Sequence, residues 1–133
     1  PAAYMVGRQA VAPCELGGYR LPAGATVLMG QWLVHRDPRW FDEPERFHPD
    51  RWADGLAKRL PKFAYFPFGG GGRLCIGNSF AMMEACLVLA TVARRCRFTL
   101  VPGQAIRPAP AITLKPSPGI QVVVRLIAQR GAA

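Results

Sequence analysis

The order of apolar, polar and turn-forming residues predicts several short elements in the first half of the chain. Residues 15–30 alternate β-prone runs with turn sequences such as Gly17-Gly18, which is typical of a small antiparallel sheet. Residues 31–41 favour a short helix that Pro38 stops, because proline lacks a backbone N–H and restricts the residue before it. Five prolines between residues 37 and 67 then predict an irregular segment.

The second half of the chain predicts one long helix followed by strands. Residues 78–96 have the length and apolar content of a helix of about five turns, which Asn78 or Ser79 could cap. The apolar face of this helix is wide, so we expect the helix to be buried. The β character returns at residues 97–103 and 119–127, on either side of a proline-rich stretch.

Composition and charge limit the possible classes of protein. Half of the 133 residues are hydrophobic, which is enough for a core, and the net charge of +9 favours an acidic partner, a nucleic acid or an anionic cofactor. The basic residues are scattered, without the clusters of a nucleic-acid surface, so we expect no nucleic-acid partner. The longest apolar run, residues 85–93, is far shorter than the roughly 20 residues of a membrane span, and none is expected in this segment.

The four cysteines show neither C-x-x-C pairs nor zinc-site spacing, and no secretory signal accompanies them. We therefore expect reduced thiols and a cytoplasmic location. The first residues include no initiating Met and no evident start of a domain, so we also expect the chain to be part of a longer protein. Cys14, Cys86 and Cys96 are interpreted as ordinary small apolar residues.

Cys75 stands out because it follows four consecutive glycines, residues 69–72, and directly precedes the predicted long helix. The unpaired N–H groups and the dipole of a helix N-terminus favour a thiolate over a thiol. The glycines, together with Gly77, remove Cβ atoms and permit positive φ, so the backbone can approach a flat ligand or the sulfur. This pattern predicts a thiolate held among backbone amides.

Two other interpretations of this segment fit less well. The glycines lack the Lys-Ser or Lys-Thr of a phosphate-binding P-loop, and Leu74 and Cys75 break the spacing of a dinucleotide-binding motif. A cysteine hydrolase would pair Cys75 with His35 or His48, the only histidines. Such an enzyme has no evident need for the four glycines, and the sequence alone does not place either histidine near the thiol.

The segment spells F-x-x-G-x-R-x-C-x-G and resembles the haem-binding signature of the cytochrome P-450 monooxygenases. The positions that carry the resemblance are Phe68, Gly71, Arg73, Cys75 and Gly77, followed by Phe80-Ala81. The preceding residues 21–52 are similar to the strand–turn–strand, His-Arg-Asp-Pro and meander segments of that family, and end in Phe47, Pro49, Arg51 and Trp52.

The resemblance implies a fold class and a place in a domain. The expected fold is mainly α with small β-sheets (α+β), as in the C-terminal portion of the family fold: β-turns, meander, Cys-loop, long proximal helix and C-terminal strands. Residues 1–133 would then be the C-terminal, haem-proximal part of one incomplete domain. The central helix, the Glu-x-x-Arg helix and most of the distal pocket of the family have no counterpart in this sequence.

The resemblance also implies roles for individual residues around haem b. Cys75 would be the axial thiolate ligand of the iron, Arg73 would pair with a haem propionate, and Phe68 would pack beside the thiolate. The other implied cofactor-binding residues lie in the same loop and at the start of the helix: Gly69, Gly71, Ile76, Gly77 and Ala81. Arg51 would be a structural residue of the meander. Arg8 or His35 could reach a propionate, or be a solvated arginine and an ordinary turn histidine.

The implied function is oxygen insertion from O2 into a small lipophilic substrate, with electrons from a ferredoxin, a flavodoxin or a reductase domain. A soluble bacterial protein suits the composition. We expect the segment alone to be inactive and poorly folded, because it would cover only one face of a haem. The alternatives are a catalytically incompetent haem-binding remnant or interaction fragment, and a haem-thiolate peroxygenase or isomerase.

Overall fold

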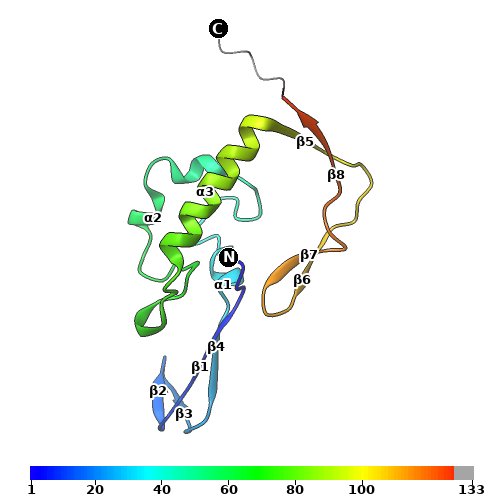
Figure 1. Ribbon diagram of the computed structural model, residues 1–133. Coiled ribbons are helices and arrows are strands. Elements are labelled where there is room, and N and C mark those ends of the chain that lie inside the picture. Colours follow the sequence, from blue (N-terminus) through cyan, green and yellow to red (C-terminus); the bar gives the residue numbers. More distant parts are fainter. Residues whose placement is uncertain (128–133) are drawn as a thin grey trace. The chain divides into compact units, whose positions relative to one another are not determined.

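The computed structural model describes residues 1–127, which divide into two compact units (Figure 1). The N-terminal unit is Pro1–Arg73, and the C-terminal unit begins at Leu74. The strand expected at residues 119–127 lies entirely within the described residues, whereas residues 128–133 lie outside the description. Each unit is considered by itself below.

The N-terminal unit starts with two antiparallel pairs of short strands. β1 (Val6–Gln9) pairs with β4 (Thr26–Met29), and β2 (Cys14–Leu16) pairs with β3 (Tyr19–Leu21). Gly17 and Gly18 join β2 to β3 with φ of 57° and 83°, the positive values that a tight two-residue hairpin turn requires. The predicted hairpin is confirmed, whereas β1 was not foreseen.

The rest of the N-terminal unit is irregular, as the prolines predicted, and holds only single turns of helix. These are α1 (Gln31–Val34), the 3-10 turn η1 (Pro49–Trp52), α2 (Leu56–Arg59) and the 3-10 turn η2 (Gly71–Arg73). α1 ends at Val34, with His35 as its C-cap, a few residues before Pro38, which agrees with the predicted stop. The meander is the segment from Asp37 to Pro67 between α1 and the glycine loop.

A small cluster of rings packs inside this unit. Phe41 and Ala64 are buried, and the ring centroids of Trp52 and Tyr65 lie 4.6 Å apart. The ring of His35 is 4.9 Å from that of Tyr65 and meets Phe66 edge-on at 5.3 Å. The aromatic residues of the meander thus supply packing within this unit.

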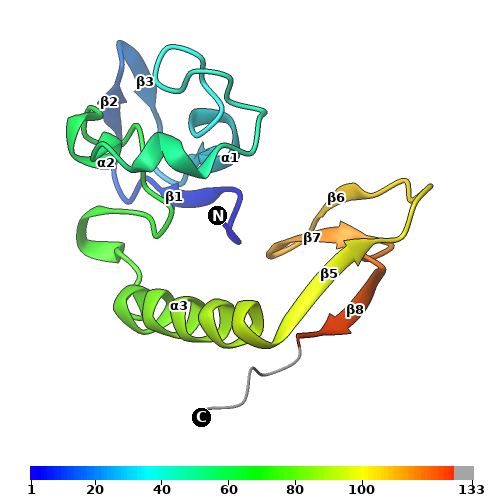
Figure 2. The same cartoon turned by 90° about the horizontal axis from the view of Figure 1, so that it is seen from above.

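The C-terminal unit consists of one long helix and two strand pairs (Figure 2). α3 (Asn78–Arg95) continues directly into β5 (Cys96–Leu100), which pairs antiparallel with β8 (Val122–Leu126). β6 (Arg107–Pro110) pairs with β7 (Leu114–Ser117) as a hairpin within the proline-rich stretch. The predicted helix and flanking strands are confirmed. The α+β character holds, but short strands outnumber helices in the described residues.

Two details of α3 differ from the sequence-based expectation. The N-cap is Gly77 without a side-chain cap, because Asn78 is already helical and its Oδ1 accepts from Ser79 N–H at 2.6 Å. No residue of α3 is buried within the described chain, and Cys86 is exposed rather than packed. The apolar residues predicted the helix correctly, but the described residues of its own unit, 74–127, do not bury it.

Candidate functional site

Cys75 has an exposed thiol and lies just ahead of α3. At Gly77, an added Cβ would lie 4.0 Å from Cys75 Sγ, so the sulfur sits directly over the backbone at the helix N-cap. The carbonyl of Gly77 accepts the N–H of Ala81 at 2.9 Å, which closes the first turn. The structure therefore brings Cys75, Gly77 and Ala81 together at the N-terminus of α3.

The glycine loop belongs to the N-terminal unit, and three of its four glycines have an identifiable reason. Gly69 and Gly71 have φ of 76° and 67°, values that side chains disfavour. A Cβ on Gly70 would collide with the ring of Phe63. Nothing near Gly72 explains that glycine. The expectation that the loop needs glycine is thus supported by two conformations and one close approach.

An apolar groove of about 560 Å³ lies beside this loop within the N-terminal unit. Its lining comes from β1, β4, α1 and the loop: Val6, Arg8, Leu28, Met29, Gly30, Val34, Phe63, Phe66, Gly70 and Gly71. Arg8 is the one charged side chain in this described lining. A largely apolar groove with a single cation at its wall suits a flat hydrophobic ligand that carries a negative group.

The predicted site residues are distributed unevenly around these features. Gly71 lines the groove, whereas Phe68 is half-buried in the loop and Arg73 is exposed in η2 without lining it. Ile76 is 99% exposed. Most apolar residues of the groove were missed by the sequence analysis. Alternate side chains of a strand point to the same face, so Val6 and Arg8 of β1 share one. This alternation is the signal that could have pointed to the wall of the groove formed by β1.

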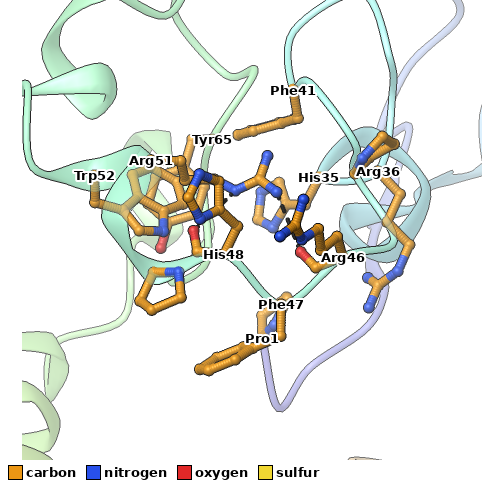
Figure 3. A pocket seen from close by; sticks show the side chains of 12 residues that line it. Pro1, His35, Arg36, Phe41, Arg46, Phe47, His48, Arg51, Trp52 and Tyr65 are labelled. Carbon is orange, nitrogen blue, oxygen red and sulfur yellow. Dashed lines mark hydrogen bonds between the residues drawn. The ribbon is translucent and has the colours of Figure 1, made fainter.

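A second pocket, of about 370 Å³, lies in the meander (Figure 3). Arg51 organises it by donating to four main-chain carbonyls: those of Asp42 at 2.5 Å, Glu43 at 3.0 Å, Arg46 at 3.1 Å and His48 at 3.2 Å. A single guanidinium thus fastens residues 42–48 to η1. This arrangement fits the structural role expected for Arg51.

His35 also borders this second pocket, and its Nε2 accepts the N–H of Phe66 at 2.9 Å. Burial is the main cause that lowers the pKa of His35 to about 4, and the positive charge of Arg36 acts in the same direction. The ring is therefore neutral at pH 7, and its Nε2 lone pair is occupied by a backbone amide. This hydrogen bond argues against His35 as the free base of a cysteine hydrolase.

The described residues contain no group of three or more His, Cys, Asp or Glu side chains that could hold a metal ion. Any metal held by this part of the chain would therefore have fewer than three ligands of these types. An iron held in a porphyrin needs only one axial ligand from the protein, and a cysteine thiolate is one of the residues that fill this position.

Comparison with known proteins decides the family. Residues 1–124 match the sequence profile of cytochrome P-450. The chain belongs to the cytochrome P-450 family. The sequence is 45% identical over 118 residues to cyclooctatin synthase of Streptomyces melanosporofaciens, covering 89% of this chain and 26% of that protein.

Two further comparisons agree with membership of the cytochrome P-450 family. Cyclooctat-9-en-7-ol 5-monooxygenase of Streptomyces melanosporofaciens is 42% identical over 106 residues, covering 80% of this chain and 23% of that protein. The structure of retinoic-acid-bound cyanobacterial CYP120A1 matches with a TM-score of 0.87 at 31% identity, covering 96% of this chain and 30% of that one. This P-450 chain therefore spans about a quarter of the curated relatives' length. Within residues 1–127, no helix is long and apolar enough to cross a membrane.

Proposed function

We propose that these 133 residues are the haem-proximal, C-terminal part of a single cytochrome P-450 domain, and that Cys75 is the axial ligand of haem b. The observation that carries the proposal is the exposed Cys75 thiol at the N-terminus of α3, in a chain of this family. The partial coverage of the relatives supports an incomplete domain.

The residues present fit a haem. The apolar groove accepts a flat hydrophobic ring, and the positive φ of Gly69 and Gly71 gives the loop a path close to it. Arg73 would bind a propionate through its guanidinium, and Phe68 would exclude water beside the sulfur. Gly77, Ile76 and Ala81 would present backbone and small apolar surface at the start of α3, with the amides after Cys75 tuning the ligand.

The proposed activity of the whole protein is that of a monooxygenase. When bound, the haem supplies the oxygen chemistry, and the residues of this chain hold it, exclude water and anchor the thiolate. The electrons would come from a ferredoxin, a flavodoxin or a reductase domain, and the substrate would be a small lipophilic molecule. Relatives named as a synthase and a monooxygenase support this class.

Two alternatives share the same thiolate. A peroxygenase or isomerase would differ in the residues of the distal pocket, and an incompetent remnant would lack that pocket. The coding sequence upstream of Pro1 discriminates them, because an acid–alcohol pair on the central helix indicates a monooxygenase. The exposed apolar residues of α3 support the expectation that the chain alone is inactive and prone to aggregate.

The test is a carbon-monoxide difference spectrum of the reduced full-length protein that carries these residues. Cys75→Ala should abolish the Soret band typical of thiolate ligation. Cys86→Ala is the matched control, because Cys86 is also exposed but lies on the body of α3, and it should keep the band. A thiolate-type band that survives in Cys75→Ala would contradict the assignment.

A further inference from the structure

Two side chains, one from α1 and one from its C-cap residue, hold the backbone of a single distant residue. Gln31 Nε2 donates to the carbonyl of Phe66, and His35 Nε2 accepts the N–H of the same residue at 2.9 Å. Gln31 and His35 are four residues apart, which places them on one face of a helical turn. Both polar groups of one peptide segment are therefore satisfied by side chains that are more than 30 residues away in the sequence.

These hydrogen bonds are partly buried. Gln31 is completely buried, and the rings of Tyr65 and Phe66 pack against His35 at 4.9 and 5.3 Å. A buried donor or acceptor that loses its partner carries the full cost of desolvation, so each bond restricts Phe66 more strongly than a surface contact would.

Phe66 begins the turn that leads from the meander into the glycine loop. Its carbonyl also accepts the N–H of Gly69 at 2.9 Å, which closes a turn over Pro67 and Phe68. Proline at the second position and glycine at the fourth are typical of such a turn. Phe66 also lines the apolar groove, so its backbone sets both a wall of the groove and the direction in which the loop leaves it.

We propose that Gln31 and His35 are positioning residues that clamp the amide and carbonyl of Phe66 and thereby fix the start of the loop leading to Cys75. The haem part of this inference rests on the proposed function, whereas the clamp itself is testable without haem. It also assigns His35 Nε2 to a backbone amide rather than to a propionate.

The first experiment measures hydrogen exchange of the Phe66 amide in the full-length protein. His35→Phe keeps a ring but removes the acceptor, and it should accelerate this exchange about 5- to 10-fold. His35→Gln places an amide oxygen near the position of Nε2, and it should restore protection to within about twofold of wild type. The matched control is His48→Phe, which alters the other histidine and should leave Phe66 unchanged.

The second experiment follows the thiolate-type Soret band of the reduced carbon-monoxide complex in the same variants. The measured quantity is the intensity of this band relative to the total bound haem. We expect it to fall in His35→Phe and to be kept in His35→Gln and His48→Phe. Gln31→Glu replaces the donor by an oxygen facing the Phe66 carbonyl at nearly constant volume, and it should also lose the band.

Each outcome decides a part of the proposal. Exchange that is equally fast in His35→Phe and His35→Gln would overturn the acceptor role of His35. If the Phe66 amide exchanges faster in His35→Phe but the thiolate-type Soret band is unchanged, the two hydrogen bonds to Phe66 stand. The proposal that they position the loop leading to Cys75 would then be overturned. If His35→Phe does not fold, wild-type-like protection of Phe66 in His35→Gln supports the clamp and loss of protection overturns it. A wild-type protein without haem would contradict the proposed function, and hydrogen exchange would still decide the clamp.

Discussion

The two units of this chain differ in what fixes their side chains. The N-terminal unit contains the buried residues Phe41, Ala64 and Gln31, together with the carbonyl-bonding Arg51 and the clamp on Phe66. In the C-terminal unit no residue from 74 to 127 is buried, although its backbone forms a regular helix and two strand pairs. Irregular backbone is thus held by specific side chains, whereas regular backbone here is held mainly by its own hydrogen bonds.

The long helix illustrates what the C-terminal unit lacks. Phe80 and Leu87 are 64% and 61% exposed, and charged residues on α3 are few. A helix that is apolar on most sides is typical of one covered by other elements. The contrast between the units is therefore a contrast between side chains that pack within their own unit and side chains that the described residues of their own unit leave uncovered.

The largest expected effect is the loss of a buried ring. Phe41→Ala in the full-length protein should lower the free energy of unfolding by about 3–5 kcal/mol, because it leaves a cavity among His35, Trp52 and Tyr65. Urea denaturation measures this, with the exposed Phe47→Ala as the control. An effect no larger than that of the control would mean that the packing of the N-terminal unit is not as described.

The sharpest test of the contrast is Leu87→Ser. In the isolated chain it should raise the soluble fraction, since it removes an exposed apolar side chain. In the full-length protein it should cost about 2–5 kcal/mol, because we propose that α3 is covered there. Solubility and urea denaturation measure the two arms. Equal stability of wild type and variant in the full-length protein would show that this face of α3 stays exposed.

Arg51→Ala should destabilise the full-length protein by about 2–3 kcal/mol, because four carbonyls lose their charged donor. Arg51→Lys should recover only a minor part of the free energy of unfolding that Arg51→Ala loses, since an ammonium cannot reproduce the guanidinium fork. Denaturation measured alongside Arg59→Ala, a basic residue of α2, provides the control. Full recovery by lysine would indicate that charge rather than geometry is required.

The smallest effect concerns pH. Because the pKa of His35 is lowered to about 4 from 6.5, the unfolded chain takes up a proton before the folded one does. The contribution of His35 to stability is therefore complete above about pH 6.5 and declines as the pH falls towards 4. His35→Gln should flatten this part of the profile of denaturation midpoint against pH. A profile identical to wild type would exclude His35 as its source.

Local chemistry accounts for what the sequence predicted well. Gly17-Gly18 dictated a hairpin turn, the prolines excluded long elements from the meander, and the apolar run at 78–96 specified α3. The cysteine loop was predictable because Cys75, Arg73 and the glycines stand close together in the sequence. Prolines in β6 and β7 hid that hairpin, since proline argues against a strand.

The features that the sequence missed depend on contacts between distant segments. Nothing in the residues 31–35 indicates that Phe66 is their partner, and nothing near Arg51 indicates which carbonyls it binds. The groove walls from β1 and β4 likewise require a strand pairing across some 20 residues of sequence. A side chain that hydrogen-bonds to a main-chain group can have any residue type as its partner. The sequence of the partner segment therefore gives no sign of the contact.

The shared carbonyl of Phe66 has a practical consequence for protein design. A cysteine loop transplanted into another scaffold as residues 66–77 alone would keep its turn over Pro67 and Phe68, since that turn is local. It would lose the two hydrogen bonds from Gln31 and His35 that hold Phe66 in the N-terminal unit. A minimal graft should therefore include residues 31–35 as well, so the transferable unit is discontinuous in sequence.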